Sequence, residues 1–384
     1  MNRALLWPAA WRLGAAGRPV TSSWRPSAAT IGAMAVTSHE IVECRGDGRE
    51  RGRAHGEALR EPIHGLLERW DARAAARLGR PPQTLVSDLV ETTGFLAAIE
   101  RHTPVLLAEV RGIAEGSNVA FDRILALNLM DEEWWFTAPA EPRNACTLIA
   151  VGASGGRPSL LAQNMDLPEV MDGAQAIVRY DDGTGDGGTV LTAAGMVGLT
   201  GVSSAGLGVC VNTLSMLNHS RDGLPVAFVM RGALAQGSVA GAAAFLGRAP
   251  HASGQHYALA DATEVAGYEC SAAGAVRSDS GNGRLCHTNH PLRSTDLDPA
   301  VPAEGREDSH IRLAAIEAAA PDVATGADCE RALADREAPL CVVAEPGHPW
   351  LTFGSIWAEL GASPRVRIAP GPPDRTAWLD ALPA

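Results

Sequence analysis

The chain has 384 residues, of which 46% are hydrophobic and 20% are charged. This balance is typical of a globular protein with a sizeable core, and the length suits one large domain or two ordinary ones. The formal net charge of −12 argues against nucleic acid as a partner, because a phosphate backbone would meet a surface of mostly like charge. No apolar run reaches the roughly 18 residues that a membrane span needs, so we expect no membrane partner.

The seven cysteines indicate a reducing compartment. Their number is odd, and no two of them form a C-x-x-C pair. A disulfide framework does not suit this pattern, so we expect reduced thiols and a cytoplasmic location.

The first 35 residues differ from the rest of the chain in composition. They contain arginine, alanine, serine and proline but no acidic residue, which is typical of an organellar transit peptide. The alternatives are a disordered tail, or an upstream start codon with Met34 as the true start. We therefore treat residues 1–37 as a disordered or targeting-like extension and expect one domain over residues 38–384.

The part of this domain before residue 146 is predicted to be mainly helical after one short strand. Apolar side chains recur every three or four residues, as in helices that pack on a common core. The predicted strand covers 39–46, and the predicted helices cover 49–79, 81–103, 104–118 and 121–135.

The pattern changes to β at Cys146. Two apolar runs flank Ser154-Gly155-Gly156-Arg157, which predicts a hairpin. With further strands and two helical segments, this order predicts an α+β fold in which helices cover two antiparallel sheets, a four-layered αββα sandwich. The strands are predicted at 146–153, 158–167, 174–182, 189–204, 206–216, 256–263, 265–280, 283–291, 350–360 and 365–371, and the helical segments at 225–248 and 308–336.

Cys146 lies where a polar loop enters the first strand of the β-rich part. A reactive side chain at such a boundary is placed like a nucleophile on a rigid scaffold, although an inert buried cysteine is the alternative. On the returning strand, Asn164 and Asp166 share a face because side chains alternate along a strand. Asp166 should stand beside the start of the cysteine strand, either as part of a polar site or as a hydrogen-bonded strand end.

The segment NACTLIAVGASGGRPSLLAQNMD (144–166) resembles the acyl-coenzyme A:6-aminopenicillanic acid acyltransferase family, the isopenicillin N acyltransferase-like enzymes. In that family an Ala-Cys-Thr or Gly-Cys-Thr junction precedes a hairpin and a Gln-Asn-x-Asp motif. The resemblance runs from about residue 40 to the end of the chain, and it implies the αββα sandwich of N-terminal-nucleophile hydrolases. Further similar segments are RGRAHGEAL (51–59), TAAGMVGLTGVSSAGLGVCVNTL (192–214), HTNHPL (287–292) and TFGSIWAEL (352–360).

The resemblance implies a precursor that cleaves itself between Ala145 and Cys146 into residues 38–145 and 146–384, which stay associated. Cys146 would then be the nucleophile and its α-amine the base. Asp166 would orient them, and Asn289 would donate a hydrogen bond to the oxyanion.

The implied activity is that of an autoproteolytically activated cysteine amidase or acyltransferase. Its partner would be a small-molecule amide or acyl thioester. No metal or bound cofactor is expected, although acyl-coenzyme A would suit the role of co-substrate.

Three further residues are secondary candidates for the site: Asn164, Asn212 at the end of a strand, and Ser355 in the C-terminal strand. The chain also departs from the family, because GHPWL (347–351) lacks the Ser-Arg pair that some members carry upstream of this strand. That departure favours another acyl acceptor or plain hydrolysis over penicillin acyl transfer.

Several alternatives stay open from the sequence. One is a non-enzymatic binding protein of the same fold, and another is a cysteine peptidase that pairs Cys146 with His287. A zinc site of Cys286, His287 and His290 is a third. The aromatic segment 131–136 either lines a substrate pocket or packs at a helix end.

Overall fold

The computed structural model describes residues 41–137, 145–185, 187–279, 283–302, 307–345 and 348–382. The predicted extension, residues 1–37, lies outside them. Residues 39–384 form one compact unit, and the following description concerns this unit alone.

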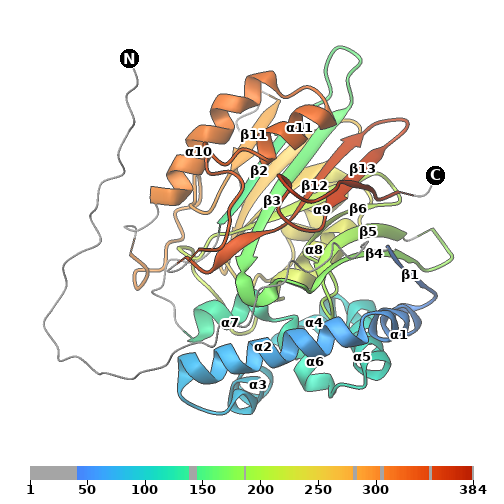
Figure 1. The fold of residues 1–384 in the computed structure, drawn as a ribbon, viewed down its shortest axis with the longest axis vertical. Coiled ribbons are helices and arrows are strands. Elements are labelled where there is room, and N and C mark those ends of the chain that lie inside the picture. The colour runs from blue at the N-terminus through green and yellow to red at the C-terminus, as the bar shows by residue number, and fades with distance from the viewer. Residues whose placement is uncertain are drawn as a thin grey trace, which may run out of the picture. The chain divides into compact units, whose positions relative to one another are not determined.

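Two sheets are stacked between two layers of helices (Figure 1). A six-stranded sheet has the order β11-β2-β3-β12-β13-β14, and an eight-stranded sheet has the order β1-β4-β5-β6-β7-β8-β9-β10. Helices α10 and α11 pack on the outer face of the six-stranded sheet, and helices α2 to α9 pack on the outer face of the other. The predicted α+β class and four-layered αββα arrangement are confirmed.

The strands are antiparallel to their neighbours except β1, which pairs with β4 in parallel. Their bounds are β1 Val42–Arg45, β2 Ala145–Val151, β3 Ser159–Pro168, β4 Gln175–Asp181, β5 Gly187–Ala193, β6 Thr200–Ser203, β7 Gly208–Thr213, β8 Gln255–Ala260, β9 Val265–Ser271, β10 Gly274–Arg277, β11 Arg284–His287, β12 Trp350–Leu360, β13 Arg365–Ala369 and β14 Leu379–Asp380.

The helices are shorter than predicted, because most long predicted segments contain a break. Apolar periodicity continues through a bend when both halves pack on the same core, so the pattern alone does not reveal it. The bounds are α1 Gly48–Ala58, α2 Arg60–Leu78, α3 Pro82–Glu91, α4 Phe95–His102, α5 Pro104–Ser117, α6 Phe121–Leu127, α7 Met130–Thr137, α8 Val226–Leu234, α9 Val239–Leu246, α10 Glu307–Ala319 and α11 Gly326–Leu333.

The β2–β3 hairpin positions the candidate nucleophile. Its turn has Gly155 at φ 58° and Gly156 at φ 81°, left-handed values that a two-residue hairpin turn of this kind requires. The resulting register places Ala145 opposite Asp166 and Cys146 opposite Met165. The turn chemistry therefore sets which side chains meet at the start of β2.

Apolar side chains from both sheets fill the space between them. Burial of each large aliphatic side chain contributes about 1.5–3 kcal/mol relative to exposure. This layer holds β2 and β3 rigidly against the eight-stranded sheet. It includes Leu148, Leu161, Ile177, Leu191 and Ile356.

Helices α1 and α5 pack with their backbones in contact. A Cβ atom on Gly52 would lie 2.0 Å from the Glu109 carbonyl oxygen, and one on Gly112 would lie 2.2 Å from the Arg49 carbonyl oxygen. The glycines of the RGRAHG segment are therefore needed for close helix packing.

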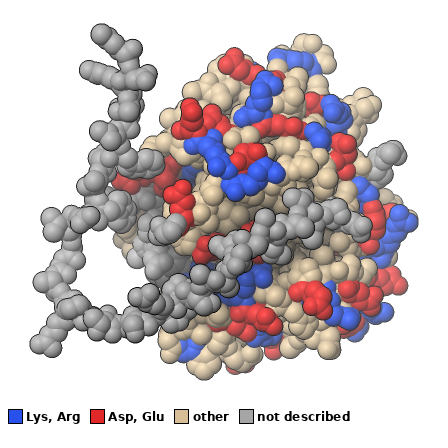
Figure 2. All heavy atoms as spheres, viewed as in Figure 1, with Lys and Arg blue, Asp and Glu red and all other residues tan. Residues whose placement is uncertain are grey.

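On the face shown in Figure 2, acidic and basic side chains are interspersed. Several charged side chains of the described residues form ion pairs, such as Arg80 with Asp88. Within the described ranges, no helix has the length and apolar character that a membrane span needs.

Candidate functional site

Cys146, at the start of β2, lies in the wall of a small cavity. The residue is 5% exposed, and the cavity encloses about 20 Å³. That volume admits about one water molecule, whereas ligand pockets measure roughly 300–1,000 Å³. Among the described residues, the candidate nucleophile is thus buried beside a space of water size.

The cavity is mainly apolar. Its walls come from α7 and α8, from strands β2, β3 and β7, and from residues 198–199. Asp131, Asp166 and Thr213 are its polar members, and the remaining lining residues are Met130, Trp134, Cys146, Met165, Leu167, Gly198, Leu199, Val211, Val226, Ala227 and Met230.

Asn289 and Arg312 hold the backbone of Cys146 from both sides. The N–H of Cys146 donates to Asn289 Oδ1 at 2.7 Å, and Arg312 Nη1 donates to the Cys146 carbonyl oxygen at 2.7 Å. Arg312 Nη2 also donates to Asn289 Oδ1 at 3.0 Å. Since this N–H belongs to the Ala145–Cys146 peptide bond, the site fixes the orientation of that bond.

Asn289 faces Cys146 as a hydrogen-bond acceptor. Its Nδ2 donates to the Thr213 carbonyl oxygen at 3.1 Å, on the side away from Cys146. The sequence predicted a donor to an oxyanion at this position. In the observed arrangement Oδ1 of the asparagine holds the nitrogen of Cys146.

Asp166 is 1% exposed and stands opposite Ala145 in the hairpin. Its Oδ1 accepts a hydrogen bond from Thr352 Oγ1 at 2.6 Å, and its Oδ2 is buried without a partner among the described residues. Burial raises the pKa of Asp166 to about 7, although the Arg312 charge opposes this shift. The carboxyl group therefore exchanges its proton near neutral pH.

The thiol of Cys146 needs a base to react. Burial raises its pKa to about 12, and the charge of Asp166 contributes to this rise. A thiol with this pKa is protonated at neutral pH, and the thiolate is the nucleophilic form. A proton acceptor beside the thiol is thus a requirement of any chemistry here.

Arg312 was missed by the sequence analysis, although a signal for it exists. The buried positions of helix α10 are Ser309, Arg312 and Ile316, the spacing of one helix face. Two polar residues on the buried face of a short helix indicate a buried polar site.

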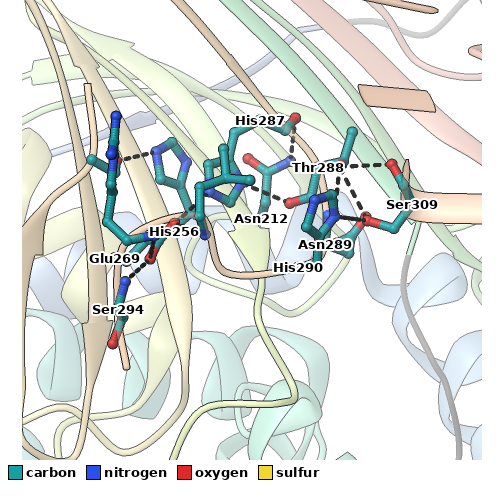
Figure 3. A network of polar contacts seen from close by, with 12 residues as sticks. Asn212, His256, Glu269, His287, Thr288, Asn289, His290, Ser294 and Ser309 are labelled. Atoms are coloured by element: carbon teal, nitrogen blue, oxygen red, sulfur yellow. Dashed lines mark hydrogen bonds and ion pairs between the residues drawn. The ribbon is translucent and has the colours of Figure 1, made fainter. Parts of the chain in front are cut away.

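A buried network supports the turn that carries Asn289 (Figure 3). His287 Nε2 bonds Glu269 Oε1 at 3.0 Å, and its ring stacks on His256 with centroids 3.7 Å apart. The N–H of Asn289 donates to Ser309 Oγ at 2.8 Å. Asn212 Nδ2 donates to the His287 carbonyl oxygen at 3.4 Å, so Asn212 belongs to this network and does not line the cavity.

Asn164 and Ser355 also lie outside the cavity lining. Asn164 Nδ2 donates to the carbonyl oxygens of Leu333 and Leu340, at 2.8 and 2.7 Å. Its Oδ1 accepts the hydroxyl of Ser355 at 2.5 Å. These contacts connect β3 and β12 to α11, which is a supporting arrangement.

The alternative partners of Cys146 are engaged elsewhere. His287 does not line the cavity, and both its ring nitrogens have partners, Glu269 and the Thr288 carbonyl oxygen.

Within the described ranges, no group of three or more His, Cys, Asp or Glu residues is placed to hold a metal ion.

The aromatic segment 131–136 contributes both to the cavity lining and to packing at a helix end. Trp134 lines the cavity. Trp135 stacks on His219 with centroids 4.9 Å apart and meets Phe95 edge to face, as a packing residue at a helix end does.

Residues 153–360 match the sequence profile of the family described as acyl-coenzyme A:6-aminopenicillanic acid acyl-transferase. A curated relative is the 40 kDa form of the acyl-coenzyme A:6-aminopenicillanic-acid-acyltransferase of Emericella nidulans. It is 26% identical over 261 residues, which are 65% of this chain and 69% of the relative.

Solved structures with similarity to the chain include a bile acid hydrolase and a penicillin acylase. A mutant of the conjugated bile acid hydrolase from Clostridium perfringens has a TM-score of 0.40 and 13% identity, over 62% of this chain and 97% of that chain. Penicillin V acylase from Agrobacterium tumefaciens has a TM-score of 0.34 and 14% identity, over 61% of this chain and 86% of that chain.

Proposed function

Because the chain belongs to the acyl-coenzyme A:6-aminopenicillanic acid acyl-transferase family, we propose that it is a self-cleaving cysteine amidase or acyltransferase with Cys146 as its nucleophile. Membership supports acyl transfer or amide hydrolysis as the type of reaction. The family match begins at residue 153, after the proposed junction. The assignment of Cys146 therefore rests on the geometry around it, above all on the hydrogen bond from its N–H to Asn289.

Self-cleavage begins with attack of Cys146 Sγ on the carbonyl carbon of Ala145. The Sγ–C bond forms, the C–N bond breaks, and the thiol proton ends on the nitrogen of Cys146. Water then hydrolyses the thioester, which leaves a carboxylate on Ala145 and restores the thiol. Asn289 and Arg312 support this step because they hold the N–H and the carbonyl of Cys146 while the bond rearranges.

Asp166 is the proposed proton acceptor in the precursor. The α-nitrogen of Cys146 is still an amide at this stage, so it cannot act as the base. Asp166 pairs with Ala145 across the hairpin, has a buried oxygen without a partner among the described residues, and has a pKa raised to about 7. A base with that pKa is suited to proton transfer at neutral pH.

Turnover repeats the same chemistry on a substrate. The new α-amine, with an ordinary pKa of roughly 7.7–8, takes the thiol proton. Asn289 Oδ1 already accepts from this nitrogen and would keep it oriented. Attack on a substrate amide gives an acyl thioester on Cys146. Water resolves it in an amidase, and an amine resolves it in an acyltransferase.

A substrate screen with mass-spectrometric detection tests this proposal. N-acyl amino acids, β-lactams, amine conjugates and acyl-coenzyme A thioesters are incubated with the wild-type protein and with Cys146→Ala, each with and without an added amine. We expect acyl products from the wild type only, and an amine-dependent product if transfer dominates. Equal turnover by Cys146→Ala would reject Cys146 as the nucleophile.

A further inference from the structure

Asp131 is the cavity carboxylate that the proposed reaction does not use. It lies in the first turn of α7 and lines the cavity together with Cys146. Thr213 Oγ1 and Gln255 Nε2 donate to its Oδ1 at 2.8 and 3.2 Å. Both donors therefore fix the same oxygen, and Oδ2 has no hydrogen bond among the described residues.

The described residues that line the cavity supply no cation to Asp131. The described lining residues include Asp131 and Asp166 but no lysine, arginine or histidine. The position of Asp131 in the first turn of a helix explains a preference for an acid there. It does not explain why that acid, which is partly buried, lines a mainly apolar cavity with no cationic side chain among the described lining residues.

Asp131 and Cys146 line the same cavity, and the charge of Asp131 contributes to the raised pKa of the thiol. A group bound by Asp131 would thus be near the carbonyl carbon that Cys146 attacks. Burial raises the pKa of Asp131, while Thr213 and Gln255 lower it. A cation in the cavity would favour the ionised carboxylate and give its free oxygen a partner.

We propose that Asp131 binds an ammonium group of the substrate, so that the enzyme acts on N-acyl amides with a cationic amine close to the scissile carbonyl. This inference rests on the proposed function, because it takes the cavity at Cys146 to be the substrate site. The ammonium group belongs either to the acyl part or to the amine part of the amide. Experiments on each part distinguish the two.

Two pairs of nearly isosteric substrates provide the test. The first pair compares 4-aminobutanoyl with pentanoyl amides of one chromogenic amine. The second compares hexanoyl amides of ethylenediamine and of propylamine. In the pair that places the ammonium correctly, we expect wild-type kcat/KM to favour the charged member by about tenfold or more, the size of one charge-assisted hydrogen bond. Asp131→Asn should abolish that preference.

Glu132→Gln is the matched control. Glu132 is the next residue and is fully buried, but it accepts from Ser253 Oγ and the Val226 N–H and does not line the cavity. This variant should keep the preference for the charged substrate. Asp131→Ser is a second variant of the site, and thermal melting identifies which of the two variants is folded.

The outcomes separate this inference from the proposed function. Loss of the preference in a folded Asp131 variant, with the neutral substrate still turned over, supports it. Equal rates for the charged and neutral members of both pairs, or an unchanged preference in Asp131→Asn and Asp131→Ser, would overturn it. Either result leaves the role of Cys146 intact, which turnover by Cys146→Ala would reject.

Discussion

The carboxylate of Glu269 holds the chain on both sides of Asn289. Before Asn289 it bonds His287, and after it Oε1 accepts the N–H of Leu292 at 2.6 Å. Oε2 accepts the N–H groups of Arg293 and Ser294 at 3.0 and 2.5 Å. One buried carboxylate thus pins both ends of the turn that presents Asn289 to Cys146.

The same contacts favour the ionised form of Glu269. Each oxygen of Glu269 already accepts two donors, so no lone pair is left for a proton. Burial would raise the pKa of Glu269, but the bonds from His287, Ser294 and Leu292 lower it below its usual value. His287 thus contacts Glu269 through Nε2 and the Thr288 carbonyl oxygen through Nδ1.

Glu269→Gln should slow self-cleavage and lower kcat by about 10- to 100-fold. The glutamine NH2 group would replace one carboxylate oxygen and face hydrogen-bond donors at one end of the turn. KM should change little if the effect acts through Asn289. Gel time courses of freshly purified precursor and steady-state kinetics measure both quantities.

A double variant tests whether Glu269 acts through Asn289. Asn289→Ala alone should slow self-cleavage strongly, and adding Glu269→Gln to it should slow the remaining rate no further. Glu132→Gln, another buried acid that binds a backbone N–H, is the control for general destabilisation. A Glu269→Gln protein that cleaves within about threefold of the wild type would contradict this role.

Self-cleavage should depend on the ionisation of Asp166. Its carboxylate becomes available as pH rises through about 7, so the rate should increase between pH 6 and pH 8 and then level off. Asp166→Asn should remove this dependence and most of the rate. Precursor that is recovered from inclusion bodies and refolded at pH 5.5 provides the starting material for the measurement.

Stability should change with pH in the opposite direction. The folded-state pKa of Asp166 lies above the ordinary value of 3.8, so between about pH 4 and 7 the folded state binds the proton more tightly. The contribution of Asp166 to the free energy of unfolding therefore falls as pH rises through this window. Urea unfolding of Cys146→Ala should give a lower free energy of unfolding from Asp166 at pH 7.5 than at pH 5. Adding Asp166→Asn should reduce the difference between the two pH values.

Self-cleavage should need the two separate donors of the Arg312 guanidinium group and not only its positive charge. It donates to Cys146 through Nη1 and to Asn289 through Nη2, which a lysine ammonium cannot reproduce in one geometry. Arg312→Lys should cleave more slowly than the wild type, and Arg312→Met more slowly still. Equal rates for all three proteins would exclude a role for this contact.

Gly112→Ala should destabilise the fold by about 1–3 kcal/mol, because its methyl group would overlap the Arg49 carbonyl in the α1–α5 contact. Gly65→Ala in helix α2 is the control, since its methyl group would meet only the end of the Arg69 side chain at 3.3 Å. Alanine there should be neutral or stabilising. Urea unfolding in the Cys146→Ala background measures both.

The local parts of the site could be predicted from the sequence. Turn glycines and strand alternation predicted the β2–β3 hairpin, and hence Asp166 beside Cys146. The same alternation placed Asn164 with Asp166, but Asn164 lies under α11 and away from the cavity, because two residues along a strand span almost 7 Å. A shared face does not make a shared site.

The long-range parts could not be predicted. Arg312 reaches Cys146 over 166 residues of sequence, and Glu269 reaches the Asn289 turn from a neighbouring strand. The spacing of residues within one segment does not predict contacts with a distant segment. The orientation of Asn289 is a further case, because the competing partners Thr213, Cys146 and Arg312 decide which end of the amide faces the nucleophile.

The intact mass of the purified protein tests the central claim most directly. We predict two chains in place of one of 40.0 kDa, with a break between residues 145 and 146 and a free α-amine on Cys146, while Cys146→Ala stays whole. A wild-type protein that remains a single chain of 40.0 kDa and still turns over N-acyl amides would contradict it.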